Sequence, residues 1–349
     1  MEFTEIFKKK AEHKCWQRIP DDKVIANIPS GTVFQKDKAY FVVRMSEMFI
    51  RNSRKLWRKF YPILHGFTMY RKTEVHEVVG PGQLKELSAS NVDRITTFNC
   101  RLSGPIAFLG DDIQIVAGLY AVPGGDAAKA LLDTVSTISG LGGLDLGTAM
   151  AITQVVKSGV ESILNLDEAQ LQIGINDSFY SNNPLRAGFH VAINAKRDDV
   201  DFTNLWLKNG HLLEGADISS AKPYDAQDYM VLEIEHRDHL DDWAGLPELA
   251  GYDKAFSEII KNANLMRETQ KSKLNEHYIQ FREAVKTSKA LITPDKERIC
   301  QSVANDLKDR MSEVVLFESA CDFDFLEIAE RMTTFETEVQ EGIIEKSLF

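Results

Sequence analysis

Alternating apolar and polar residues are typical of strands, and they dominate residues 17–250. In residues 39–50, Phe41, Val43 and Met45 occupy every second position and so share one strand face. The same alternation over 228–235 turns Met230, Leu232 and Ile234 inward and places Tyr229 and Val231 on the other face. Further strands are expected at 67–70, 73–79, 95–100, 106–109, 113–122, 171–175 and 189–194.

The clearest local signal is Asn209-Gly210, which lies between the apolar segments 205–208 and 211–214. A two-residue type I′ turn needs positive φ at both central positions, and Asn-Gly is its preferred sequence. We therefore predict a β-hairpin over Leu205 to Glu214.

A second periodicity, of three to four residues, marks residues 127–166 as a helical pair. Its two apolar stripes are Ala128, Leu131, Leu132, Val135 and Ile138, then Ala149, Ile152, Val156, Val160 and Ile163. Glycines at 140, 142 and 143 break the helix between them. Charge-free runs in this segment reach only 11 residues, whereas a membrane span needs about 20. We expect a buried helical hairpin; the alternatives are an oligomer interface and a hairpin that inserts into a bilayer.

Helical periodicity returns after residue 251 and is also expected at the N-terminus, over residues 1–16. Apolar stripes lie within 256–263, 274–285 and 299–311, and Thr293-Pro294 is a helix start. A fourth helix, 322–346, carries the stripe Phe325, Ile328, Met332, Phe335, Val339 and Ile343.

These patterns predict an α+β protein. The predicted parts are an N-terminal helix (1–16), a β-sandwich-like region of short antiparallel strands (17–250) with the inserted helical pair 127–166, and a C-terminal helical region (251–349). The two strand series before and after the helical pair form either one sandwich or two small ones.

Composition narrows the class of protein. The chain has 349 residues, of which 44% are hydrophobic and 27% charged, as in an ordinary globular protein. The N-terminus has no apolar run typical of a secretory signal. The four cysteines are scattered, which favours reduced thiols and a cytoplasmic location over a disulfide framework.

Charge is unevenly distributed along the chain. The net charge is −11, and residues 316–349 hold nine acidic and two basic residues, a balance of −7. By contrast, residues 51–62 are basic and aromatic. Four basic residues, Arg54, Lys55, Arg58 and Lys59, together with Trp57, are candidates for binding an anion or an acidic partner. If this segment is helical, like charges four residues apart repel, and an anion would relieve the repulsion. We expect that anion to come from the acidic surface of the protein itself; the alternatives are an external phosphate, nucleic acid or anionic lipid.

The densest polar cluster is residues 233–242, directly after a predicted strand. Its candidate acid–base or metal-binding residues are Glu233, Glu235, His236 and His239. The spacing matches no defined metal signature, so we expect a solvated connection with no catalytic role. The alternative is a metal-assisted hydrolase or nuclease. In that case His236 and His239 would converge with the carboxylates.

The sequence favours a non-enzymatic cytoplasmic interaction or assembly protein. No phosphate-binding loop, dinucleotide-binding motif or serine elbow is present, and no cofactor or metal is expected. We expect a protein partner or a homo-oligomer, with the 325–343 stripe as the interface. The hydrolase and a membrane-perturbing effector that releases the 127–166 hairpin are the alternatives.

Overall fold

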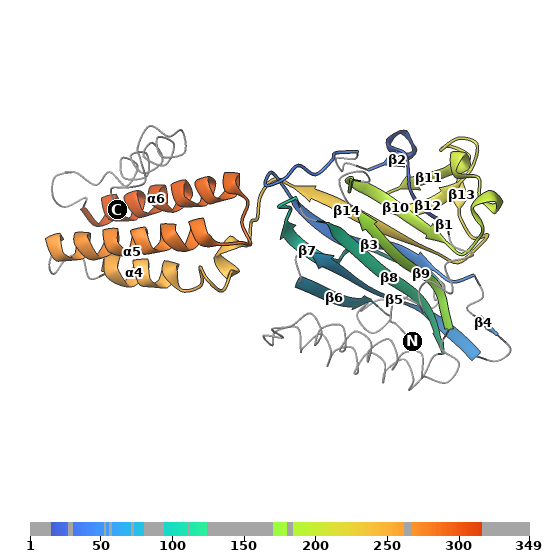
Figure 1. Cartoon of the computed structure of the whole chain (residues 1–349), viewed down its shortest axis with the longest axis horizontal. Helices are drawn as coiled ribbons and strands as arrows, with labels where there is room; N and C mark the ends of the chain where they lie inside the picture. Colours follow the sequence, from blue (N-terminus) through green and yellow to red (C-terminus); the bar gives the residue numbers. More distant parts are fainter. Residues whose placement is uncertain are drawn as a thin grey trace. The chain divides into compact units, whose positions relative to one another are not determined.

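The computed structural model describes residues 15–26, 31–51, 54–55, 58–70, 73–79, 94–110, 112–123, 170–179, 184–261 and 267–315. The chain divides into two compact units, Met1–Arg237 and Asp238–Phe349 (Figure 1). The described part of the first unit consists of strands and short 3₁₀ turns, and that of the second is mainly helical. The predicted α+β class is therefore confirmed.

In its described part, the first unit consists of three sheets. The central sheet has the order β1 (Cys15–Arg18), β10 (Gly188–Ile193), β14 (Tyr229–Arg237), β3 (Tyr40–Phe49) and β7 (Arg94–Ala107), with every neighbouring pair antiparallel. The second has the order β13 (Lys222–Pro223), β12 (His211–Glu214), β11 (Leu205–Lys208) and β2 (Val24–Ile25). The third has β4 (Arg54–Lys55), β5 (Arg58–Tyr70), β8 (Ile113–Pro123) and β9 (Gln170–Phe179), and β6 (Thr73–Val79) pairs with β5.

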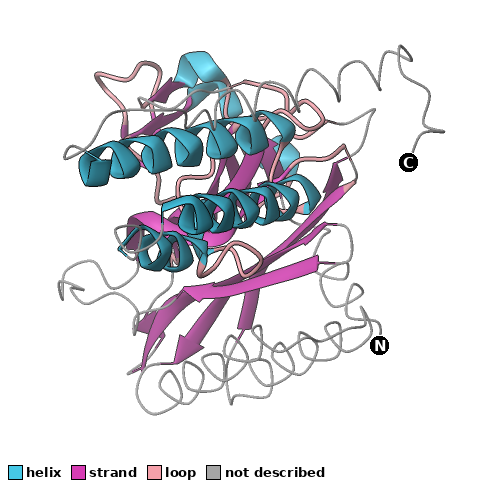
Figure 2. Cartoon of the chain, turned by 90° about the vertical axis from the view of Figure 1, so that its left-hand side faces the viewer, coloured by secondary structure: helices cyan, strands magenta, loops and turns pink. Residues whose placement is uncertain are grey.

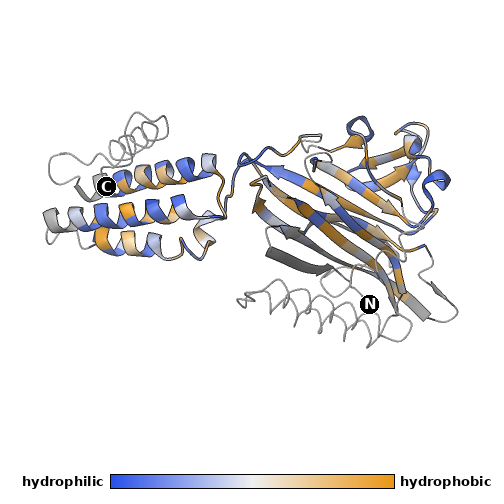
Figure 3. Cartoon of the chain, in the orientation of Figure 1, coloured by the Kyte–Doolittle hydropathy of each residue, from blue (hydrophilic) through white to orange (hydrophobic). Residues whose placement is uncertain are grey.

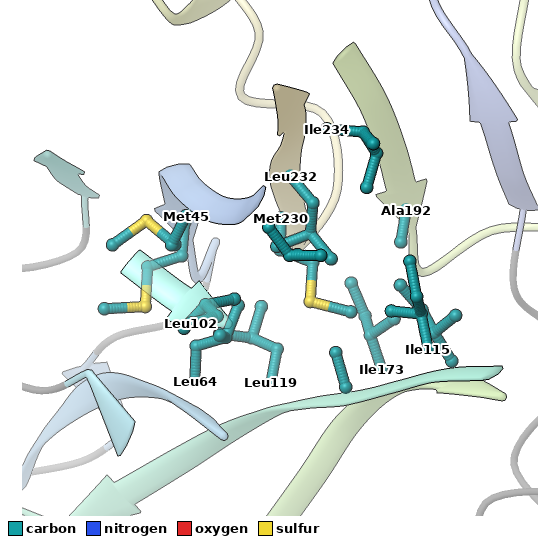
Figure 4. Close-up of a cluster of buried hydrophobic side chains, with 14 of the residues drawn as sticks. Met45, Leu64, Leu102, Ile115, Leu119, Ile173, Ala192, Met230, Leu232 and Ile234 are labelled. Carbon is teal, nitrogen blue, oxygen red and sulfur yellow. The ribbon is translucent and has the colours of Figure 1, made fainter. Parts of the chain in front are cut away.

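The central sheet separates two hydrophobic cores. Met230, Leu232 and Ile234 belong to the core shared with the third sheet, and Figure 4 shows them opposite side chains of that sheet such as Leu119 and Ile173. On the other face of the same strand, Tyr229 and Val231 belong to the core shared with the second sheet. The predicted division of this strand into two faces is confirmed.

The neighbouring strand β3 is also buried along both faces. All ten of its residues are buried, and Phe41, Val43 and Met45 lie together in the first core as predicted. Its residues are apolar except for Arg44, Ser46 and Glu47, and each of these three polar side chains has a hydrogen-bond partner within the molecule. A strand covered on both faces favours apolar residues and requires partners for its polar ones. Figure 3 shows both hydrophobic and hydrophilic positions along the strands of this unit.

The hairpin between β11 and β12 has the predicted turn. Asn209 has φ 49° and Gly210 has φ 78°, and Lys208 pairs with His211 across the turn. The Ser46 hydroxyl of β3 donates a hydrogen bond to the Gly210 carbonyl at 3.2 Å, which fixes the hairpin against the central sheet.

Gly210→Val should lower the free energy of unfolding by at least about 1 kcal/mol, because a β-branched residue resists positive φ. Lys208→Val is the matched control: it introduces the same side chain at an exposed strand position of the same hairpin. Chemical denaturation of both variants measures the difference, and equal midpoints would contradict the turn.

Several predicted boundaries were wrong. Cys15 and Trp16 were assigned to an N-terminal helix, but they lie in β1 and pair with Ile193 and Ala192 of β10. The strands expected at 95–100 and 106–109 form one irregular strand, β7. The basic residues at 54–55 and 58–59 are in strands, so the helical form considered for that segment is also wrong. For β1 and β7, pairing with a distant strand outweighs the local pattern, whereas β4 pairs locally with the start of β5.

Within residues 238–261 and 267–315, the second unit contains three packed α-helices, α4 (Tyr252–Lys261), α5 (Arg267–Thr287) and α6 (Thr293–Val315) (Figure 2). The predicted stripe of α5 is buried in full: Leu274, Tyr278, Phe281 and Val285. The unit begins at Asp238, before the expected boundary of 250/251. The reason is that the irregular segment before α4 forms hydrogen bonds with the helical part of the unit. Its Leu240 N–H donates to Asp295 of α6 at 2.7 Å, and its Glu248 accepts from the Ser288 hydroxyl, directly after α5, at 2.6 Å.

Asp295→Ala should destabilise the second unit by on the order of 3 kcal/mol. The Asp295 side chain is fully buried and also accepts a 2.6 Å hydrogen bond from Arg298 Nε. Its removal therefore leaves the Leu240 N–H and the Arg298 Nε–H without this acceptor, although Arg298 still donates to the Leu240 carbonyl at 3.2 Å. Glu297→Ala, an exposed position of the same helix, is the control. Loss of α-helical circular dichroism on denaturation reports the difference; two variants of equal stability would contradict this role.

Residues 124–169, which include the predicted helical pair, and residues 316–349, which include the predicted fourth helix, lie outside the described residues. Among the helices that the structure describes, none is long and apolar enough to span a membrane.

Candidate functional site

The structure separates the four residues of the predicted acid–base cluster. Strand alternation puts Glu233 and Glu235 on the face of β14 that carries Tyr229 and Val231. His236 is on the opposite face, where its ring lies 5.0 Å from that of Phe34.

His239 belongs to the second unit, and its Nδ1 lies 3.6 Å from the buried Asp295 carboxylate. The two histidines therefore sit in different surroundings, one in each compact unit. Only the two carboxylates share a site.

The two carboxylates form a charged cluster with two arginines. Glu235 accepts hydrogen bonds from Arg44 Nε and Arg237 Nε, each at 2.6 Å. Arg44 lies on β3, where it pairs in register with Glu233, and Arg237 is the last residue of β14. The Glu235 side chain therefore connects Arg44 on β3 to Arg237 at the end of β14. We call these four residues, Arg44, Glu233, Glu235 and Arg237, the β14 charged cluster.

The two carboxyl groups have opposite pKa shifts. Burial raises the pKa of Glu233 to about 7, and the nearby Glu235 charge adds to the rise, whereas Arg44 and Arg237 oppose it. Burial also raises the pKa of Glu235, but hydrogen bonds from Arg237 and Arg44 outweigh burial, and the net pKa is below its ordinary value. The difference follows from geometry, because both guanidiniums are directed at Glu235.

A carboxyl that titrates near neutral pH can exchange a proton under physiological conditions, which is the property of a general acid or base. The groups beside Glu233 are guanidiniums and a second carboxylate, and guanidiniums do not titrate in this range. In the described part of the chain, no group of three or more His, Cys, Asp or Glu could hold a metal ion.

A second buried carboxylate was missed by the sequence analysis. Glu47 of β3 is fully buried and accepts hydrogen bonds from Tyr229 Oη at 2.7 Å and Leu212 N–H at 2.8 Å. His211 Nδ1 lies 3.1 Å from its other oxygen. The side chain anchors β12 of the second sheet to the central sheet. A glutamate inside a mainly apolar strand was the available signal, because a buried charge needs partners.

The basic segment forms a two-stranded ribbon. The register of β4 and β5 places Arg54 opposite Lys59 and Lys55 opposite Arg58. We call residues 54–59 the basic ribbon. Trp57 and the expected interface residues Phe325, Ile328, Met332, Phe335, Val339 and Ile343 lie outside the described residues.

The buried His190 has the surroundings of a structural residue. Its ring stacks on Trp16 with centroids 5.1 Å apart and meets Phe179 edge-on at 6.4 Å. Burial and the Arg18 charge lower the pKa of His190 to about 4, against a raising effect of the Gly188 backbone, so the ring is neutral at physiological pH.

Comparison with known proteins assigns no family. No family model matches the chain, and searches of curated proteins and of solved structures gave no match.

Glu233→Gln should change how stability depends on pH. The folded-state pKa of Glu233 lies above its ordinary value of 4.5, so its contribution to stability is complete below that value and is lost as pH rises through 7. Between pH 6 and 8 the parent protein should lose about 1.4 kcal/mol more stability than the glutamine variant.

Urea denaturation at several pH values measures this difference. Glu214→Gln, an exposed position on β12, is the control and should follow the parent. A parallel pH dependence in parent and Glu233→Gln would show that Glu233 does not titrate in this range.

Proposed function

We propose that the protein is a non-enzymatic binding protein that acts through protein–protein contacts, with the basic ribbon as one contact surface. The observation that carries this proposal is the register of β4 and β5, which places four basic residues in two directly opposed pairs. Like charges directly opposite each other across an antiparallel pair are destabilising. An acidic partner surface would offset that cost.

Charge balance favours an acidic protein segment over nucleic acid as the partner. The chain as a whole carries −11, which opposes the approach of a long polyanion. Residues 316–349 have a balance of −7 together with a long apolar stripe. A segment of this kind, from a second copy or another protein, would match the ribbon in charge, and the stripe would supply most of the affinity.

The alternative of a metal-assisted hydrolase or nuclease has one observation in its favour, the near-neutral pKa of Glu233. Against it, His236 lies on the other face of β14 and both carboxylates are accompanied by guanidiniums. The membrane-perturbing alternative depends on residues 127–166, which lie outside the described residues.

Reversing Arg54, Lys55, Arg58 and Lys59 to Glu should weaken binding of an acidic partner. The probe is a labelled peptide of residues 316–349, followed by fluorescence anisotropy, and sedimentation velocity reports the oligomeric state. At low salt we expect the affinity for the peptide to fall by at least about tenfold, and the loss should be smaller at high salt because ions screen exposed charges.

The matched control reverses four exposed lysines of the same unit, Lys36, Lys38, Lys208 and Lys222, which gives the same change in net charge. Equal losses in both variants would indicate a non-specific charge effect. An unchanged oligomeric state and peptide affinity in the ribbon variant would contradict the proposal.

A further inference from the structure

The chain leaves the first unit directly after the β14 charged cluster. Arg237 is the last residue of β14, and the second unit begins at Asp238. Pairing of β14 with β10 ends at Ile234, opposite Gly188, whereas pairing with β3 continues to Arg237. The last three residues, 235–237, are therefore held by a strand on one side only, in addition to the side chains of the cluster.

Glu235 is the side chain that closes this strand end. Its two oxygens accept one hydrogen bond from Arg44 on β3 and one from Arg237. The side chains of Arg44, Glu235 and Arg237 are 11%, 21% and 29% exposed, so the two ion pairs are partly shielded from water and from salt. Partly buried pairs of this kind hold a strand end more firmly than surface pairs do.

We propose that residues 235–237 form a proton-sensitive clamp, which separates from β3 more readily when the Glu233 carboxyl loses its proton. Glu233 is 6% exposed and lies on the same face as Glu235, in register with Arg44. Its ionised form repels Glu235 and competes for Arg44. Opening of the strand end lets both carboxylates reach water, which removes the desolvation cost.

The groups around Glu233 support opening of the clamp on loss of the Glu233 proton. On β14 the charged neighbours are Glu235 and Arg237, and on β3 the neighbour is Arg44. On β10 the residue in register is Phe189, which has no titratable group; the next, His190, belongs to the opposite face, where it stacks on Trp16. Arg101 of β7 pairs in register with Arg44, one strand further away. Burial raises the pKa of Glu233 to about 7, so the clamp would respond within the physiological range.

Opening of the clamp frees residues 235–237 from β3 directly before Asp238, where the second unit begins. This response belongs to the first unit and is independent of the proposed partner of the basic ribbon.

Hydrogen exchange of the full-length chain, read by mass spectrometry at pH 6 and pH 8, tests the proposal. After division by intrinsic exchange rates, opening of residues 235–237 should increase about tenfold from pH 6 to pH 8. Residues 45–49 of β3, which pair with 229–232 of β14 and not with the clamp, should change little. Glu233→Gln should abolish the increase, and Glu214→Gln should retain it.

A second variant distinguishes opening of the clamp from a general loss of stability. Arg44→Lys keeps the charge but loses the planar guanidinium, so it should raise opening of 235–237 at both pH values and keep the pH dependence. Equal protection of 235–237 at pH 6 and pH 8 in the parent would overturn the proposal. So would a pH-dependent increase that survives in Glu233→Gln, or one that is equal throughout β3.

Discussion

The structure of the first unit depends on the pairing of β3 with β14 at the centre of a sheet that is covered on both faces. Each of these strands contributes apolar side chains to two cores, one shared with the third sheet and one shared with the second. Apolar burial on both faces is the largest favourable contribution available to a strand. The same placement means that any charge on these strands must be paired within the molecule, and this constraint explains the polar features of the unit.

Three charged side chains of β3 and β14 illustrate the constraint. Glu47 is satisfied by Tyr229 and Leu212 N–H and anchors the second sheet. Glu235 is satisfied by two arginines. Glu233 is the exception, because both guanidiniums are directed at its neighbour, and its raised pKa follows from that. The paired carboxylates Glu47 and Glu235 therefore join neighbouring strands of the unit. In our proposals, Glu233 makes the strand end sensitive to protons, and the basic ribbon binds a partner.

Much of the fold could be predicted from the sequence, because alternation and turn chemistry act locally. The two faces of β14 and the Asn209-Gly210 turn are examples. The strand identity of Cys15 and Trp16 could not be predicted, since it comes from pairing with β10, far along the chain. The candidate site could also not be predicted in full. The sequence placed Glu233, Glu235, His236 and His239 in one cluster, but strand alternation and the boundary at Arg237 separate them. The partner that forms the site, Arg44, lies 191 residues from Glu235.

The central claim is that one sheet serves both cores, so the two cores should unfold together. Variants that keep a single tryptophan, either Trp16 beside the first core or Trp206 on the second sheet, allow each side to be followed by fluorescence during urea denaturation. A shared central sheet predicts the same midpoint and the same slope for both probes. Two separate transitions, with the second sheet unfolding while the Trp16 environment stays intact, would contradict the account.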